Sequence, residues 1–129
     1  EKFRNGILGN QLLSRFRVFF DYNKGQLIVK PYHARQKPFV MDRSGLVIFA
    51  YGVFFNQFIV KDIIPNSPAA QVDIRPDDII LKIQGLPSHV FRLDGINSVL
   101  QKRPGKRISL FVSRDGQTLK KVFYLRQLV

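Results

Sequence analysis

The sequence contains no cysteine and no tryptophan. The absence of cysteine excludes disulfide bonds, a thiol nucleophile and a thiolate metal site. No stretch of the sequence approaches the roughly 18 consecutive apolar residues that a membrane-spanning helix needs. The glycines occur singly, so there is no glycine-rich loop of the kind that binds phosphate groups.

Residue patterns that support catalysis are missing as well. The two histidines, His33 and His89, have no G-x-S-x-G serine near them and no partner at the spacing of a zinc or calcium site. Aspartic proteases need two carboxylates, each held in a D-T-G or D-S-G turn, and neither tripeptide occurs. We therefore predict a chain without catalytic residues, without a cofactor and without a bound metal.

Acidic residues are few, because 21 Lys and Arg stand against 9 Asp and Glu, which gives a net charge of +12. Residues 1–43 carry nine basic and three acidic residues, and residues 44–129 carry twelve and six, so each part contributes +6. Nucleic-acid-binding proteins usually gather their basic residues on one face or one helix. We therefore expect no nucleic-acid partner, and binding to another anionic surface stays open as an alternative.

Residues 1–32 read as a first unit made of a short helix and a β-hairpin. Asn10 is suited to capping the helix, and residues 17–22 and 26–30 have the composition of paired strands. The apolar helix residues expected on one face are Leu12, Leu13 and Phe16. A unit of this size cannot bury its own apolar faces, so we expect it to dock on another domain or to form a homodimer.

Residues 33–43 read as a polar, proline-containing linker, and residues 44–129 read as the main domain. Ser67 before Pro68 predicts the start of one helix, and residues 93–100 have the apolar stripe of another. The expected strands cover residues 46–49, 57–64, 79–83, 107–113 and 118–125. The pattern predicts a mainly β fold with short helices, a small antiparallel barrel or sandwich capped by two helices.

The main domain resembles the PDZ family in its bacterial, circularly permuted arrangement. The resemblance rests on N-S-P-A-A at residues 66–70 and I-R-P-D-D-I-I-L-K-I-Q-G at residues 74–85. The sequence departs from the family pattern at Asp77, where glycine is usual, and at Asp73, where an alanine–glycine pair is common. We expect altered turns at both positions. The resemblance implies a domain that binds a peptide or protein substrate.

Residues 1–32 are similar to the C-terminal end of a retropepsin-type aspartic protease lobe. The motif is G-I-L-G-N at residues 6–10, followed by a helix and the closing strand F-R-V-F-F-D-Y at residues 16–22. Joined to a PDZ-like domain, it implies the C-terminal fragment of a bacterial aspartyl protease whose catalytic aspartates precede Glu1. The family resemblance also implies a location in the periplasm or cell envelope.

A PDZ-like domain binds an extended peptide by adding it as a strand to an exposed sheet edge. The family has a glycine-containing loop before that edge, which Gly45, Leu46, Val47 and Ile48 resemble. The helix at residues 93–100 would form the opposite wall, with Ile96 and Leu100 lining a side-chain pocket. Apolar residues at these spacings are equally consistent with a simple core position.

Three hypotheses for the function follow from the sequence. In the first, the chain is a peptide-binding module that presents substrates to an attached protease or regulates it. In the second, the domain packs on the protease lobe with a closed groove and binds nothing in trans. In the third, the chain binds an anionic surface through its positive charge, with an affinity that collapses in salt.

Overall fold

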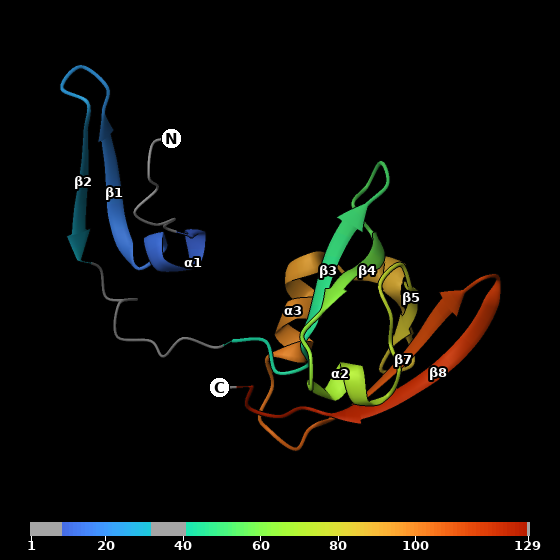
Figure 1. The fold of residues 1–129 in the computed structure, drawn as a ribbon. Coiled ribbons are helices and arrows are strands. Elements are labelled where there is room, and N and C mark those ends of the chain that lie inside the picture. The colour runs from blue at the N-terminus through green and yellow to red at the C-terminus, as the bar shows by residue number, and fades with distance from the viewer. Residues whose placement is uncertain (1–8, 32–40, 129) are drawn as a thin grey trace, which may run out of the picture. The chain divides into compact units, whose positions relative to one another are not determined.

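The structure, a computed structural model, describes residues 9–31 and 41–128 (Figure 1). The chain divides into two compact units, formed by residues 1–39 and residues 40–129. The first holds a short helix and a two-stranded sheet, and the second holds a six-stranded sheet and the remaining helices. The chain is mainly β, as the sequence predicts.

The N-terminal unit contains three elements: α1 (Asn10–Leu13), β1 (Phe16–Asp21) and β2 (Gln26–Pro31). The two strands pair antiparallel, which confirms the predicted hairpin. The predicted helix was wrong in its extent, because it ends at Leu13 and Phe16 is already the first residue of β1. An aromatic and β-branched run favours the extended chain over a further helical turn. Residues 6–8 of the G-I-L-G-N motif lie outside the described residues.

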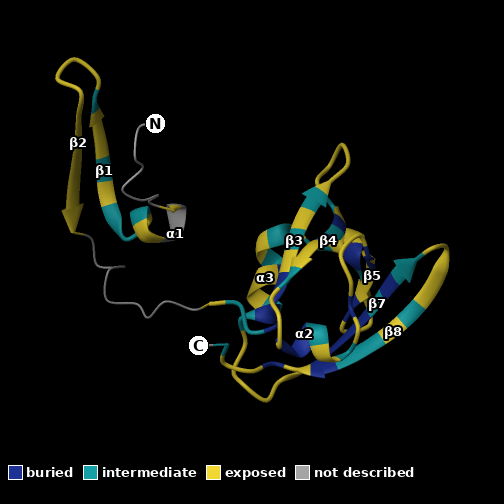
Figure 2. Ribbon diagram, viewed as in Figure 1, coloured by how far each residue is buried: buried dark blue, intermediate teal, exposed yellow. Residues whose placement is uncertain are grey.

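None of the described side chains of the N-terminal unit is fully buried (Figure 2). The register pairs apolar residues across the hairpin, with Phe20 opposite Leu27 and Val18 opposite Val29. Because alternate residues of a strand point to the same face, these pairs share one apolar face of the hairpin. The unit therefore has no hydrophobic core of its own among the described residues.

The C-terminal unit is built on one antiparallel sheet with the strand order β3-β4-β5-β7-β8, and β6 pairs with β5 beside this path. β3 and β8 are the two ends of the order, so the sheet is open rather than a closed barrel. The strands are β3 (Leu46–Tyr51), β4 (Gln57–Ile63), β5 (Ile79–Ile83), β6 (Leu86–Pro87), β7 (Arg107–Arg114) and β8 (Gln117–Tyr124).

Two α-helices and a 3₁₀ turn cap the sheet, namely α2 (Pro68–Gln71), η2 (Ser88–Val90) and α3 (Leu93–Leu100). The Ser67 hydroxyl accepts a hydrogen bond from the N–H of Ala70 at 3.3 Å, which confirms the predicted N-cap. α3 has the predicted bounds. Over the described parts of the chain, no helix has the length and apolar character to cross a membrane.

The hydrophobic core lies between the sheet and the helices of the C-terminal unit (Figure 2). β7 is an interior strand of the sheet, between β5 and β8, and contributes three fully buried residues. Those residues are Ile108, Leu110 and Val112. Burial of large aliphatic side chains is the main source of stability for a domain of this size, so this unit is the stable part of the chain.

Candidate functional site

β3 is an edge strand with a helix beside it. Among the described strands it pairs only with β4, and α3 packs against it (Figure 1). The side of β3 that faces away from β4 therefore offers backbone N–H and C=O groups that no described strand pairs with. An unpaired strand edge of this kind is the structural requirement for binding an extended peptide.

The predicted loop residues lie at the start of this edge. Gly45 directly precedes β3 and adopts a left-handed backbone conformation, with φ +82°, which favours glycine. Leu46 is buried, Val47 is exposed and Ile48 is half-buried. The structure therefore brings the four predicted residues to one end of the edge strand.

The two predicted pocket residues of α3 lie deeper than a ligand contact requires. Ile96 and Leu100 are 0% and 1% exposed and belong to the hydrophobic core. They therefore present almost no surface to a ligand, which agrees with the alternative reading of these positions as core. Half-buried side chains of the same two elements remain accessible, namely Ile48 and Ala50 of β3 and Leu93 and Val99 of α3.

The loop before β3 is ordered by the carboxylate of Asp42. Its Oδ2 accepts hydrogen bonds from the N–H groups of Ser44 at 3.1 Å and Gly45 at 2.6 Å, and its Oδ1 accepts from the Ser44 hydroxyl at 2.8 Å. The Ser44 hydroxyl oxygen in turn accepts from the N–H of Leu46 at 3.1 Å. The N–H groups of residues 44–46 are thus all satisfied within the loop.

Arg43 fixes the loop to the C-terminal end of α3. Its Nη1 donates to the carbonyl oxygens of Gln101 and Lys102, both at 2.8 Å, and its N–H donates to the carbonyl oxygen of Leu100 at 3.2 Å. The last carbonyl groups of a helix lack partners within the helix, and a guanidinium satisfies them well. Arg43 therefore sets the distance between the start of β3 and the end of α3.

Asp42 and Arg43 were missed as functional candidates, because residues 33–43 read as a linker in the sequence. A local signal for Asp42 exists, since an aspartate two or three residues before a glycine often accepts hydrogen bonds from the following backbone. The partners of Arg43 gave no such signal, because Gln101 lies 58 residues further along the chain.

Comparison with known families agrees with this geometry. A family model described as PDZ domain matches residues 33–121, which is more than half of the chain. The chain belongs to the PDZ domain family. The family model therefore covers the glycine loop, the edge strand and the helix beside it.

The PDZ domain is similar to parts of several bacterial proteases. It is 34% identical over 61 residues to the serine endoprotease DegS of Salmonella typhimurium, a match that covers 47% of this chain and 17% of that protein. It is 35% identical over 66 residues to the magnetosome formation protease MamE of Magnetospirillum gryphiswaldense, covering 50% and 8%. The chain thus spans less than a fifth of either relative.

A solved structure gives the same result at the level of the fold. The HtrA-type protease AlgW with a decapeptide has 26% identity and a TM-score of 0.53, and the match covers 65% of this chain and 29% of that one. DegS is named as a serine protease, so these relatives give no support to the aspartic type expected for the attached protease.

The two departures of the PDZ motif lie at turns with a left-handed backbone conformation. Asp77 has φ +71° and Asp73 has φ +56°. A residue with a Cβ is strained in this region, although aspartate tolerates it better than most. Both aspartates therefore lie in a backbone conformation that glycine would adopt without strain.

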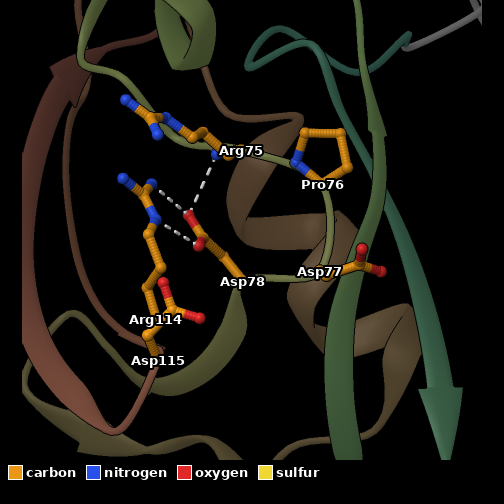
Figure 3. A pocket seen from close by; sticks show the side chains of 6 residues that line it. All are labelled: Arg75, Pro76, Asp77, Asp78, Arg114 and Asp115. Atoms are coloured by element: carbon orange, nitrogen blue, oxygen red, sulfur yellow. Dashed lines mark hydrogen bonds and ion pairs between the residues drawn. The ribbon is translucent and has the colours of Figure 1, made fainter.

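Asp73 and Asp78 belong to an ion-pair cluster centred on Arg114, beside a hollow of about 280 Å³ (Figure 3). Arg114 donates through Nε and Nη2 to the two oxygens of Asp78, both at 2.7 Å, and Asp78 also accepts from the N–H of Arg75 at 2.9 Å. The Asp77 side chain points away from this cluster (Figure 3). Asp78 and Arg114 are thus paired with each other beside the hollow, so we assign the cluster a structural role.

The cluster shifts the ionisation of its acids. Burial alone would raise the pKa of Asp78, but the hydrogen bonds from Arg114 and from the Arg75 N–H outweigh it and lower that pKa. Hydrogen bonds from Arg75 and then Arg114 lower the pKa of Asp73. Asp78 in turn raises the pKa of Arg114. All three groups therefore stay charged at neutral pH.

The phenylalanines of the β3–β4 hairpin divide between core and surface. Phe58 is fully buried, as its alternation in the strand predicts. Phe54 and Phe55 are 82% and 68% exposed at the tip of the hairpin.

Over the described residues, no group of three or more histidine and acidic side chains is placed to hold a metal ion.

Proposed function

We propose that this PDZ domain binds extended peptide segments by strand addition to β3, as the substrate-recognising module of a protease. The observation that carries the proposal is that β3 is an edge strand with α3 packed beside it. Main-chain hydrogen bonds to β3 would supply affinity, and contacts with the half-buried side chains of β3 and α3 would supply selectivity.

Within this proposal, Gly45, Leu46, Val47 and Ile48 position the entrance of the groove. Leu93 and Val99 are the accessible apolar side chains of the opposite wall, and Ile96 and Leu100 support that wall from the core. We expect micromolar dissociation constants, about −8 kcal/mol or weaker, because a flexible peptide loses conformational entropy when it is ordered.

The proposed attachment to a protease is supported by relatives that are themselves named as proteases. The name of DegS favours a serine protease, whereas the α1–β1–β2 unit has the helix and closing hairpin expected for the end of an aspartic protease lobe. A location in the periplasm or cell envelope, expected from the family resemblance, is part of the same proposal.

The proposed groove is tested by titrating the ¹⁵N-labelled chain with a decapeptide library. We expect amide chemical-shift changes in β3 and α3 and none in β8, the other edge strand of the same sheet. Leu93→Ala should weaken binding about fivefold through lost apolar contact. Leu119→Ala is the matched control, because Leu119 is also half-buried against the core but lies on β8.

Shift changes concentrated in β8, or equal effects of the two leucine variants, would place the site elsewhere. A library without any binder would favour the second hypothesis, in which the groove is closed by the protease lobe and the domain is structural. Binding to polyanions with a steep salt dependence would favour the third hypothesis, in which the net charge of +12 determines the partner.

A further inference from the structure

The loop at the entrance of the proposed groove already contains a carboxylate. The Asp42 carboxylate accepts hydrogen bonds from the N–H groups of Ser44 and Gly45. It also accepts one from the Ser44 hydroxyl, whose oxygen in turn accepts from the N–H of Leu46. Three consecutive N–H groups of this kind form a small concave site that is complementary to an anion. In this chain the anion is supplied by the protein itself.

The loop has little freedom to exchange this carboxylate for another. The carbonyl oxygen of Gly45 accepts a hydrogen bond from the N–H of Ile64 at 2.9 Å, and the Ser44 side chain is fully buried. A carboxylate from a ligand would therefore find no free donor at residues 44–46 and would face the charge of Asp42. Burying an anion without hydrogen-bond donors is costly, and two nearby carboxylates repel each other.

The cations that belong to the same region are committed to backbone oxygens. The Arg43 guanidinium binds the carbonyl oxygens at the end of α3, and the Arg126 guanidinium binds the carbonyl oxygen of Asn66. Because both guanidinium groups are bonded to these carbonyl oxygens, neither is placed to bind the carboxylate of a ligand. The charge next to residues 44–46 is therefore the negative charge of the Asp42 carboxylate.

We propose that the groove accepts internal segments of a polypeptide and gains no affinity from a free C-terminal carboxylate, with Asp42 as the residue that determines this specificity. This inference rests on the proposed function and names the ligand class of the same site. A module that reads internal extended segments would select unfolded chains or exposed loops rather than chain ends.

The test compares decapeptides made both as free acids and as C-terminal amides, with affinities for the full chain measured by calorimetry. A site that captured the terminal carboxylate would favour the free acid by about tenfold or more, because charge-assisted hydrogen bonds are strong. We expect the two forms to bind within about twofold of each other, or the amide to bind more tightly. The same sequence placed inside a longer peptide should bind equally well.

Two variants separate the charge of Asp42 from the net charge of the domain. Asp42→Asn should shift the preference toward the free acid by about fivefold, because it removes the repulsion. Asp115→Asn makes the same charge change in the β7–β8 turn, where φ is +49° and asparagine is well tolerated, and should shift nothing. If Asp42→Asn fails to fold, the comparison of acid and amide on the unchanged chain still decides the question.

A free acid that binds the unchanged chain tenfold more tightly than its amide would overturn this inference and leave the proposed groove intact. Equal effects of the two variants would also overturn the role of Asp42. If neither form of any decapeptide binds, the proposed function fails, and the specificity inferred from it fails with it.

Discussion

A Cβ atom added to Gly45 would lie 2.1 Å from the Cβ of Ser67, the residue that caps α2. Backbone from the loop before β3 and the start of α2 are therefore in direct contact. Gly45 belongs to the predicted peptide-binding loop, and Ser67 begins the S-P-A-A motif that carries the family resemblance. The packing of the loop against the start of α2 therefore depends on both motifs.

Gly45→Ala should destabilise the domain strongly. The alanine would be strained at φ +82° and would collide with Ser67, which together should lower the free energy of unfolding by about 3 kcal/mol or more. Gly116→Ala is the control, because Gly116 has φ +76° and a Cβ added there would meet nothing within 4 Å, so only the strain of about 1 kcal/mol remains. Urea unfolding measures both, and equal losses would show that the Gly45–Ser67 contact is unimportant.

Asp77→Gly should stabilise the domain by about 0.5–1 kcal/mol, because it relieves a left-handed backbone and leaves the ion pairs of the Arg114 cluster in place. The N–H of residue 77 would keep its hydrogen bond of 2.8 Å to the carbonyl oxygen of Val60. Asp73→Gly relieves the same strain but loses hydrogen bonds to Arg75 and Arg114, so it should give no gain. Thermal unfolding distinguishes the two, and a gain from both variants would contradict the role of the Arg114 cluster.

The stability of the domain should fall in acid because of Asp78. Its pKa is lower in the folded state than in the unfolded state, so its contribution is fully present above the unfolded pKa of about 3.9 and is lost as the pH falls through the folded pKa. Asp78→Asn should cost about 2 kcal/mol at pH 7 by weakening the pair with Arg114. The cost should shrink below about pH 4.

Urea unfolding of Asp78→Asn and the unchanged chain between pH 3 and pH 7 tests this dependence. Asp115→Asn serves as the control, since Asp115 is an exposed residue of a hairpin turn. A difference between Asp78→Asn and the unchanged chain that stays constant across this pH range would mean that Asp78 does not titrate with folding.

Much of the main domain is predictable from local sequence. The bounds of α3, the N-cap at Ser67 and the hairpin turn at Asp115-Gly116 follow from short-range preferences that act within a few residues. β6 was missed, because a strand of two residues, Leu86–Pro87, leaves no periodic pattern. Local sequence preferences therefore predict helices and strands well when these are long enough for their apolar residues to repeat at a regular spacing.

The site is less predictable, because its contacts join residues far apart in the sequence. The stripe of α3 marks Ile96 and Leu100 as apolar but cannot tell a groove wall from a core, and the structure buries both. Arg43 finds its partners at Gln101 and Lys102 only once the fold has formed. Tertiary contacts such as these carry no signal in a single sequence.

The N-terminal hairpin should be less protected from hydrogen exchange than the sheet of the PDZ domain. The described residues of β1 and β2 include no fully buried side chain, whereas β7 is an interior strand with several buried side chains. Amide exchange followed by NMR at low protein concentration should be at least about tenfold faster in β1 and β2 than in β7. Equal protection in a monomer would show that the hairpin has a packing partner within the chain.

The hydrogen bonds of Arg43 have a consequence for how a ligand would be received. They tie the start of β3 and the end of α3 into one piece before any peptide arrives. A preformed receptor loses little conformational entropy on association, so nearly all of that loss falls on the incoming chain. Ligands that are already extended, such as the stretched segments of a chain undergoing unfolding, would then hold a thermodynamic advantage over flexible ones of the same sequence.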